Sequence, residues 1–414
     1  MAAFFYNVAL CLYYAGIRIT SLWNAKARLW VKGRKGWREN LCKQIEPGVK
    51  YIWFHCSSLG EFEQGRPLIE ECKTSFPDHK IILTFFSPSG YEVRKNYSKA
   101  DVVIYLPADS RKNARLFLSA ITPRLIVFVK YEYWHNYFSE IKIRNIPFFL
   151  VSATFRKQQP FFRFYGALFR RMLAAPQRIF VQNHASANLL HQIGIDNVEV
   201  AGDTRFDRVV RLASEVKDLP VFSRFKGNNK LVVAGSTWPE DEKLIASVFL
   251  PMTDNVNIVI VPHNVSQKRI GEALKIFGNN AMLLSSCGNG IPDSARVIIV
   301  DQVGLLSRIY RYADIAIVGG GFGKGIHNTL EPAVYGIPVL FGPKYEKFNE
   351  AKGLIAAGAA FMFSSETELL HIAEKLLPGD TDYLPAAKAA VDFVGLNKGA
   401  TSRIMKDICR VLDQ

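Results

Sequence analysis

Short apolar runs recur along the chain, and segments with a helical spacing of apolar residues separate several of them. This alternation predicts strands and helices that follow one another, with the strands in mostly parallel sheets. The predicted strands are 51–55, 81–85, 102–105, 125–129, 148–151 and 178–181 in the first half, and 231–234, 258–261, 281–284, 297–300, 315–318 and 339–341 in the second. Helices predicted near 384–394 and 400–413 close the chain. The pattern therefore predicts an α/β protein.

The length of the chain predicts two domains. A chain of 414 residues is too long for one ordinary core, and 49% of its residues are hydrophobic. The predicted segments are an anchor with a basic stretch at 1–40, an N-terminal domain at 41–205, a polar linker at 206–230, a C-terminal domain at 231–395 and a final helix at 396–414. Parallel sheets bind ligands at the carboxyl ends of their strands, and we expect these ends to face a cleft between the domains.

The first apolar run, Ala2 to Ile17, is interrupted by Asn7 and by tyrosine hydroxyls, and Arg18 ends it. As a helix it would be about 24 Å long, shorter than the ~30 Å hydrocarbon core of a bilayer. Cations follow the run and do not precede it, which excludes a secretory signal peptide. We therefore predict a membrane anchor that either barely spans the bilayer or lies in its interface. A buried amphipathic helix of the first domain is the alternative.

Positive charge is concentrated in the first half. Residues 1–210 hold 30 Lys and Arg against 16 Asp and Glu, whereas residues 211–414 hold 22 against 21. The segment 141–195 has no acidic residue, and aromatic rings and cations are interleaved within it. Nucleic-acid surfaces and surfaces for anionic lipid share this pattern, and a solvated basic face over core aromatics is the plain alternative. Because the anchor precedes it, we predict a membrane partner and no nucleic acid.

Cysteine and histidine spacing gives no metal motif. The six cysteines include no C-x-x-C pair and no even disulfide framework, which predicts free thiols in a reducing compartment. The eight histidines include no H-E-x-x-H motif and no paired metal spacing. We therefore predict that the protein holds no metal and no cofactor.

The most informative segment is 315–343, where an apolar strand enters a loop with glycine at 319, 320, 321, 323 and 325. A helix predicted to open near Asn328 and Thr329 carries Glu331. Glycine lets the backbone approach a ligand closely, and the start of a helix presents unpaired N–H groups. These features are typical of a phosphate-binding corner. The glycine spacing fits neither G-x-G-x-x-G nor the P-loop motif, so the corner is of another kind.

Polar residues that follow several predicted strands suit a ligand site. Glu61 comes after the first strand and a glycine, at the expected start of a helix. A carboxylate there is either a general base or a first-turn residue that complements the helix dipole. Strands of the second half lead to Ser236 with Thr237 and to Pro262 with His263. Their loops either bind a phosphate or a base, or cap helices and form turns.

Eight blocks of sequence carry a resemblance to a known family: HCSSLGE (55–61), TFFSPSGYE (84–92), YLPAD (105–109), YEYWHN (131–136), GDTRFD (202–207), AGSTWPEDE (234–242), IVPHN (260–264) and GGGFGKGIHNTLEPA (319–333). In this order and spacing the chain resembles the 3-deoxy-D-manno-octulosonic acid (Kdo) transferases of lipid A assembly. The resemblance implies a GT-B glycosyltransferase, with two Rossmann-like domains facing across a cleft and an N-terminal membrane-anchor helix. It also implies CMP-Kdo as donor, a phosphorylated and acylated lipid A precursor as acceptor, and a place on the cytoplasmic side of the bacterial inner membrane.

The resemblance also assigns candidate site residues. Glu61 falls on the glutamate of the family's S-x-G-E block and is the expected catalytic base. The expected donor (CMP) contacts are Pro262, His263, Val303, Gly304, Leu305, Asn328, Thr329, Leu330 and Glu331, with Gly320, Gly321, Ser236 and Thr237 from the loops above. The expected acceptor contacts are Ser57, Ser58, Arg156, Arg163 and Arg170.

The chain departs from the family pattern at five positions: Lys130, His263, Leu305, Ile326 and Lys347. The family commonly has Glu, Arg, Glu, Gly and Asn there. These departures concern the phosphate and donor contacts more than the fold.

The implied reaction inverts the configuration of the transferred sugar. Glu61 would take the proton of an acceptor hydroxyl, whose oxygen attacks the anomeric carbon of Kdo opposite the phosphate. The start of the corner's helix, with Ser236, Thr237 and His263, would stabilise the phosphate charge in place of a metal. Two alternatives stay open. One is another GT-B enzyme that acts on a UDP-sugar, as a transferase or an epimerase, and the other is a non-catalytic protein that binds the membrane surface.

Overall fold

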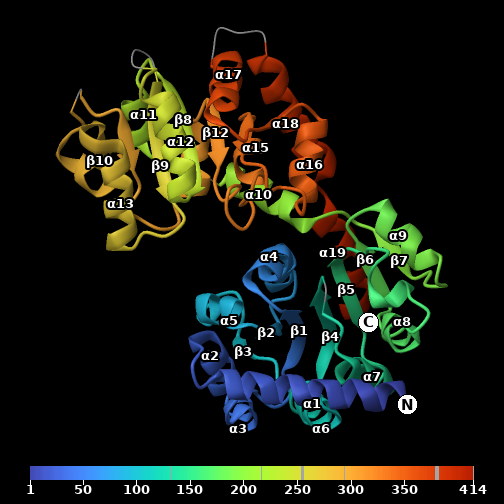
Figure 1. Cartoon of the computed structure of the whole chain (residues 1–414). Helices are drawn as coiled ribbons and strands as arrows, with labels where there is room; N and C mark the ends of the chain where they lie inside the picture. The colour runs from blue at the N-terminus through green and yellow to red at the C-terminus, as the bar shows by residue number, and fades with distance from the viewer. Residues whose placement is uncertain (131, 216, 253–255, 293, 378–381, 414) are drawn as a thin grey trace. The chain divides into compact units, whose positions relative to one another are not determined.

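The computed structural model describes residues 1–130, 132–215, 217–252, 256–292, 294–377 and 382–413. It contains two compact units: residues 1–207 with 399–414, and residues 208–398. Figure 1 shows both units as ribbons, and each is built around one sheet. The last helix of the chain belongs to the first unit, although the whole second unit precedes it in the sequence.

The sheet of the first unit has seven parallel strands in the order β3-β2-β1-β4-β5-β6-β7. Its strands are β1 (Lys50–Cys56), β2 (His79–Phe85), β3 (Val102–Tyr105), β4 (Pro123–Val129), β5 (Phe148–Ala153), β6 (Arg178–Val181) and β7 (Val198–Val200). The strand order changes direction between β1 and β4, which are neighbours. Open parallel sheets bind their ligands outside the carboxyl ends of the strands at such a switch point.

Helices cover both faces of this sheet. They are α1 (Ala2–Thr20), α2 (Ala25–Gly33), α3 (Trp37–Cys42), α4 (Leu59–Ser75), α5 (Pro88–Arg94), α6 (Arg111–Ile121), α7 (His135–Ile143), α8 (Ala167–Leu173), α9 (His184–His191) and α19 (Ala400–Leu412), with the 3₁₀ turn η1 (Pro160–Phe162). Successive residues of a strand point to opposite faces. Ile52 and Phe54 of β1 therefore pack in the cluster that contains residues of α4 and α19, whereas Tyr51 and Trp53 pack in the cluster with α6 and α7.

The sheet of the second unit also has seven parallel strands, in the order β10-β11-β9-β8-β12-β13-β14. Its strands are β8 (Lys230–Thr237), β9 (Val256–Pro262), β10 (Ala281–Leu283), β11 (Val297–Ile299), β12 (Ile315–Val318), β13 (Val339–Phe341) and β14 (Ala360–Met362). The strand order changes direction between β8 and β12.

The helices of the second unit are α11 (Pro220–Lys226), α12 (Pro239–Phe249), α13 (Gln267–Phe277), α14 (Leu306–Ile309), α15 (Leu330–Ala333), α16 (Asn349–Ala356), α17 (Glu366–Leu376) and α18 (Tyr383–Asn397). The 3₁₀ turns are η2 (Gly278–Asn280), η3 (Leu284–Asn289) and η4 (Tyr310–Tyr312). Helix α10 (Thr204–Ser214) contains the boundary between the units.

Each predicted strand is present, with small shifts at its ends, and the two closing helices are present as α18 and α19. Two strands were not predicted, β7 and β14. Both are only three residues long and lie at the edge of a sheet. Residues of an edge strand pair on one side only and need not be uniformly apolar, so they give no clear apolar run.

The segment 206–230, predicted as a linker, contains most of α10 and all of α11. Phe206 and Val209 are buried on α10, and Phe222 and Phe225 are buried on α11. Each pair has the three-residue spacing of an amphipathic helix. The polar residues between them obscured this short apolar spacing in the sequence.

We expect Ile408→Ala to destabilise the first unit. Ile408 lies on α19 and is fully buried in the core between this helix and the sheet. Truncating such a side chain typically lowers the free energy of unfolding by about 2–5 kcal/mol because a cavity remains. The exposed Lys406 of the same helix provides a control, since Lys406→Ala removes no core contact. Urea denaturation followed by tryptophan fluorescence measures the effect. Equal denaturation midpoints for the two variants would show that α19 does not stabilise this unit.

Candidate active site

The carboxyl ends of the strands at the two switch points hold many of the predicted site residues. In the first unit, β1 leads to Glu61, and the neighbouring β4 leads to Lys130 and Glu132. In the second unit, β8 ends at Thr237, and the neighbouring β12 leads to the glycine-rich loop 319–325. The topology thus brings together segments that are far apart in the sequence.

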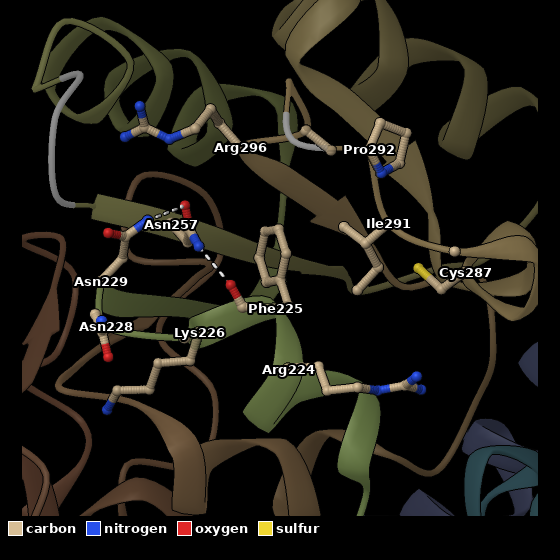
Figure 2. A pocket seen from close by; sticks show the side chains of 13 residues that line it. Arg224, Phe225, Lys226, Asn228, Asn229, Asn257, Cys287, Ile291, Pro292 and Arg296 are labelled. Carbon is tan, nitrogen blue, oxygen red and sulfur yellow. Dashed lines mark hydrogen bonds between the residues drawn. The ribbon is translucent and has the colours of Figure 1, made fainter.

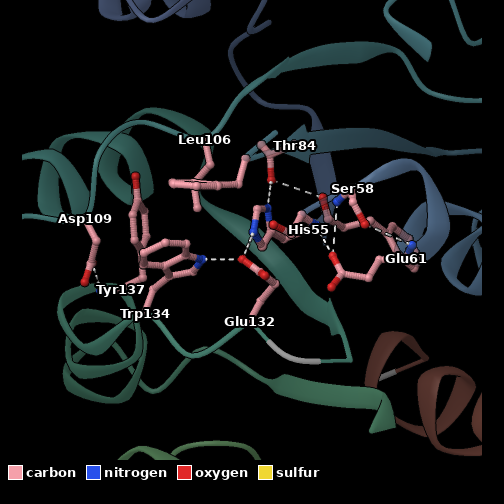
Figure 3. Close-up of polar contacts among 12 residues, drawn as sticks. His55, Ser58, Glu61, Thr84, Leu106, Asp109, Glu132, Trp134 and Tyr137 are labelled. Atoms are coloured by element: carbon pink, nitrogen blue, oxygen red, sulfur yellow. Dashed lines mark hydrogen bonds and ion pairs between the residues drawn. The ribbon is translucent and has the colours of Figure 1, made fainter. Parts of the chain in front are cut away.

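Glu61 is the third residue of α4, and its carboxylate is held at the start of this helix (Figure 3). The hydroxyl of Ser58, the N-cap, accepts a hydrogen bond from the backbone N–H of Glu61 at 3.5 Å. In return, Glu61 Oε2 accepts hydrogen bonds from the N–H groups of Ser57 at 2.5 Å and Ser58 at 3.1 Å. Oε1 makes no hydrogen bond with any described residue. The capping box therefore fixes one carboxylate oxygen and leaves the other for a ligand.

A second carboxylate, Glu132, is buried near Glu61 and forms a network of its own (Figure 3). Its Oε2 accepts a hydrogen bond from Trp134 Nε1 at 2.7 Å and lies 3.1 Å from His55 Nε2. The other ring nitrogen of His55 lies 2.8 Å from the hydroxyl of Thr84. A nitrogen that faces a carboxylate must carry the proton of their hydrogen bond. The network therefore orients Glu132 through donors on both sides.

The environment of Glu61 suits a general base. Its pKa is raised to about 8, first because the carboxyl is buried and second because the charge of Glu132 lies nearby. The N–H groups of Ser57 and Ser58, and then the cation of Lys130, act in the opposite direction. A carboxylate with a pKa near the operating pH can accept a proton with a useful driving force.

The glycine-rich loop is packed tightly against the end of β8. A Cβ atom on Gly319 would lie 2.6 Å from the carbonyl oxygen of Ser236, and Gly321 has similarly little room. Gly320 has a φ of 93°, which favours glycine, and its N–H donates a hydrogen bond to Asp241 Oδ2 at 2.9 Å. The sequence predicted that these glycines let the backbone approach a ligand closely. In the structure they let one protein segment approach another closely. The N–H of Gly320 is already used in the protein.

Three rings form a stack beside this loop. The ring of His263 is stacked on Trp238 at 5.0 Å and on His327 at 4.4 Å, with interplanar angles of 26° and 23°. Burial lowers the pKa of both histidines, and the neighbouring His263 lowers that of His327 further, to about 4. Both rings are therefore neutral near pH 7. They offer ring N–H donors to a phosphate, but no full positive charge.

The helix that follows the loop is shorter than predicted. Helix α15 has a single turn, so its dipole at a phosphate is small and the expected charge stabilisation is weaker than the sequence indicated. Asn328 donates from Nδ2 to Glu331 Oε1 at 3.0 Å and accepts from the N–H of Leu330 at 3.1 Å. Thr329 and Leu330 are fully buried. Burial raises the pKa of Glu331, which Asn328 and the cation of Arg208 oppose.

The other predicted donor residues differ in accessibility. Thr237 is fully buried, and its hydroxyl donates to Glu242 Oε1 at 2.6 Å. Ser236 has a left-handed φ of 55° and is half-buried, and Pro262 ends β9. In the loop 303–305, Val303 is 80% exposed. The donor contacts stay predictions. The hydroxyl of Thr237 is already hydrogen-bonded within the protein.

The predicted acceptor residues fall into two groups. Ser57 and Ser58 bind Glu61 through their backbone N–H groups. Arg170 donates from one nitrogen to the carbonyl oxygens of Phe161 and Arg163, both at 3.0 Å, so it stabilises its own loop. Arg156 and Arg163 are exposed, and their side chains make no polar contact with any described residue. These two arginines are the ones free to meet an anionic acceptor.

Within the described ranges no group of three His, Cys, Asp or Glu residues could hold a metal ion. The prediction that the protein uses no metal and no cofactor stays a prediction.

Two parts of the candidate site were not predicted: the network of His55, Thr84, Glu132 and Trp134, and the ring stack around His263. Each combines residues from separate strands and loops, so pairing in space, not spacing along the chain, defines them. The signal available in the sequence was the position of most of these residues at or shortly after the carboxyl ends of strands, since these ends gather at one edge of a sheet. Tyr131, in the same block as Glu132, lies outside the described residues.

A cavity of about 400 Å³ lies at the opposite, amino edge of the second sheet, where Asn229, Asn257 and Arg296 line it (Figure 2). Its polar groups are largely occupied. Asn257 donates to the carbonyl oxygen of Phe225 at 2.5 Å, and the guanidinium of Arg296 binds the carbonyl oxygens of Val256 and Met252. The cavity lies away from the switch point, so we assign it no role in the site.

Sequence comparison relates the chain to known enzymes. Residues 31–208 match the family described as 3-deoxy-D-manno-octulosonic-acid transferase (kdotransferase). A 3-deoxy-D-manno-octulosonic acid transferase of Aquifex aeolicus is 28% identical over 334 residues, which cover 79% of this chain and 86% of that protein. A bifunctional glycosyltransferase/methyltransferase of Fusobacterium nucleatum is 28% identical over 339 residues. These cover 79% of this chain but only 52% of the Fusobacterium protein, about half its length.

Structural comparison gives the fold class. A UDP-GlcNAc 2-epimerase of Neisseria meningitidis, solved with UDP-GlcNAc bound, superposes with a TM-score of 0.61 at 16% identity and covers 87% of this chain and 100% of its own. At this identity the likeness shows the fold alone. The two parallel sheets and this neighbour confirm the predicted GT-B class. Within that class, residues 31–208 match the Kdo transferase family, and the predicted resemblance to this family is confirmed.

We expect His263 and His327 to stay neutral to lower pH than an ordinary histidine, with His327 titrating at about 4. The substitution Trp238→Ala removes one side of the stack and exposes His263. Its pKa should then rise toward the unperturbed value of ~6.5. An NMR titration of the histidine ring carbons measures both pKa values. A pKa at or above ~6.5 for either ring in the unmodified protein would contradict the stacked arrangement.

Proposed function

We propose that the protein transfers Kdo from CMP-Kdo to a lipid A precursor and inverts the configuration of the sugar. The observation that carries the proposal is Glu61 at the switch point of the first sheet, with one carboxylate oxygen fixed by backbone N–H groups and the other unpaired among the described residues. The match of residues 31–208 to the Kdo transferase family supports the reaction type. The identities of donor and acceptor are parts of the proposal.

In this reaction Glu61 Oε1 accepts the proton of an acceptor hydroxyl. The hydroxyl oxygen forms a new bond to the anomeric carbon of Kdo. The bond from that carbon to the phosphate oxygen breaks, and its electron pair leaves with CMP. Because a phosphate monoester anion is a stable leaving group, the step needs no general acid. The fixed Oε2 keeps the base in position, so no reorientation is required when the hydroxyl arrives.

The donor would bind at the switch point of the second sheet. Glu331 lies there with Arg208 and Asn328, and its carboxylate can accept hydrogen bonds from ribose hydroxyls. The ring stack supplies neutral N–H donors for the phosphate. Since the family commonly has Arg at the position of His263, we propose that this chain binds the donor phosphate with less positive charge than its relatives.

The proposed place of action is the cytoplasmic side of the bacterial inner membrane. Helix α1 is long and apolar enough to cross a membrane by length and composition, and it is the one helix among the described residues that meets this test. The acceptor carries acyl chains, so an enzyme that acts on it must work at a bilayer surface.

We expect Glu61→Gln to lower Kdo transfer by a factor of about 10²–10⁴, because the amide can still bind the N–H groups of Ser57 and Ser58 but cannot accept the proton. Binding of CMP should be unchanged, since Glu61 belongs to the acceptor side of the reaction. Mass spectrometry of lipid IVA incubated with CMP-Kdo measures transfer. The exposed Glu71 of the same helix supplies the control Glu71→Gln. Near-normal transfer by Glu61→Gln would refute the assignment of the base.

The rate of transfer should rise with pH and level off above about 8. The base must be ionised to act, and the pKa of Glu61 is raised to about 8. The substitution Glu132→Gln removes the neighbouring negative charge, so the pKa of Glu61 should fall and the rise in rate should move to lower pH. The pH dependence of kcat, measured for both proteins, tests this. A shift to higher pH would show that Glu132 does not act on Glu61 through its charge.

A further inference from the structure

Helix α1 has two distinct faces. Ala3, Tyr6, Leu10, Tyr14 and Ile17 are half-buried, and their three- and four-residue spacing puts them on one stripe of the helix. Ala3 and Tyr6 pack against the core of the first unit. The other side of α1 is exposed, and no residue of the helix is fully buried. The helix is therefore attached to the unit along one stripe only.

Polar contacts fix this inner stripe to the loop before α6. Tyr6 donates from its hydroxyl to Asp109 Oδ2 at 2.8 Å, and the hydroxyl of Tyr14 accepts from the N–H of Asp109 at 2.9 Å. Between them, Asn7 Oδ1 accepts from Asn136 Nδ2 at 2.9 Å. Asp109 is only 3% exposed, so withdrawing Tyr6 would remove one of the few donors to a buried carboxylate.

These contacts set the orientation of the helix. Tyr6 and Tyr14 are eight residues apart, which is about 12 Å along a helix. Both bind the same loop, so α1 lies flat along the unit over at least this length. A helix that crosses the bilayer would have to leave Asp109 and place the hydroxyls of Tyr6 and Tyr14 in hydrocarbon, where each unsatisfied polar group is costly.

The outer stripe is apolar. Phe4, Phe5 and Leu12 are 67%, 65% and 69% exposed, and Ile19 is 59% exposed. Leu22 and Trp23, just after the helix, are 75% and 68% exposed. A row of this kind along a helix suits insertion between the headgroups and the acyl chains of a bilayer.

The surrounding charge matches an anionic lipid surface. No acidic residue occurs before Glu39, whereas Arg18, Lys26, Lys32 and Lys35 are exposed cations. Cations next to an inserted helix bind the phosphates of anionic lipids.

We propose that α1 does not cross the membrane but lies in the plane of an anionic bilayer, with its outer stripe inserted and its inner stripe bound to the first unit. The inference specifies the membrane location in the proposed function, and its tests need neither donor nor acceptor. Failure of sugar transfer and failure of membrane docking can thus be told apart.

The in-plane position places the bilayer at the same edge of the sheet as the candidate base, because the loop that α1 binds follows β3. From α1 a row of ring contacts leads to the switch point: Tyr14 stacks on Trp30 at 5.5 Å, Trp30 meets Phe86 at 5.7 Å, and Phe86 meets Trp134 at 4.8 Å. Trp134 binds Glu132, the neighbour of Glu61. A lipid acceptor could therefore reach Glu61 while its acyl chains stay in the bilayer.

The first experiment measures binding of the full-length protein to lipid vesicles by flotation, with and without phosphatidylglycerol. We expect binding to require the anionic lipid. Leu12→Glu should weaken binding at least about tenfold, because burial of a leucine is lost and a charge is added. The matched control is Leu396→Glu, since Leu396 is 84% exposed in the second unit. Equal binding of the two variants would overturn the proposal. The proposal would also be wrong if vesicles bound neither the unmodified protein nor the variant, and Leu12→Glu instead dissociated a dimer that forms without lipid.

The second experiment separates an in-plane helix from a spanning one. A peptide tag followed by a protease site is added before Met1, and inside-out membrane vesicles are prepared from bacteria that express this chain. If α1 lies in the plane, protease added outside removes the tag from sealed vesicles. If the tag is protected until detergent opens the vesicles, α1 spans the membrane and the proposal is wrong.

Discussion

The candidate active site depends on the electrostatic repulsion between two buried carboxylates, Glu61 and Glu132. Burial alone would favour a neutral, protonated Glu61. The N–H groups of Ser57 and Ser58 counter this effect from one side, and Lys130 adds a cation. The family commonly has Glu where this chain has Lys130, so the charge around the base is balanced differently here. These opposing effects leave the pKa of Glu61 raised, at about 8, so the carboxyl becomes a proton acceptor as the pH approaches this value.

Much of the fold could be predicted because strands buried on both faces must be continuously apolar, as in Ile126 to Val129. The pattern failed where this requirement relaxes, at the edge strands β7 and β14 and in the short helices α10 and α11. The strand pattern also drew attention to Glu61, which lies in the first turn of the helix that follows β1. It could not pair Glu132 with His55, because those side chains meet only after the parallel sheet has placed β4 beside β1.

The second unit shows why a glycine pattern alone does not define ligand contacts. Gly319 permits close packing of the loop on the end of β8 and Gly321 permits close packing on Gly342, while the N–H of Gly320 donates to Asp241 and is not free for a phosphate. With a single-turn helix behind the loop and two neutral histidines beside it, the corner has little positive charge of its own. The donor site that we propose here therefore depends on Glu331, Arg208 and ring N–H groups more than on a helix dipole.

In the proposed reaction a water-soluble sugar donor must meet a lipid acceptor, and both the N-terminal helix and Glu61 serve this meeting. A spanning anchor would only raise the concentration of the enzyme at the membrane, and a tether leaves the orientation of the unit undefined. A helix fixed through Tyr6 and Tyr14 transmits the orientation of the bilayer to the unit, because it cannot rotate independently of Asp109. With the helix in the proposed in-plane position, the ring contacts from Trp30 to Trp134 hold the carboxyl edge at a constant position relative to the membrane. On this argument, the apolar helix contributes to catalysis by orientation, and its hydrogen bonds matter as much as its hydrophobicity.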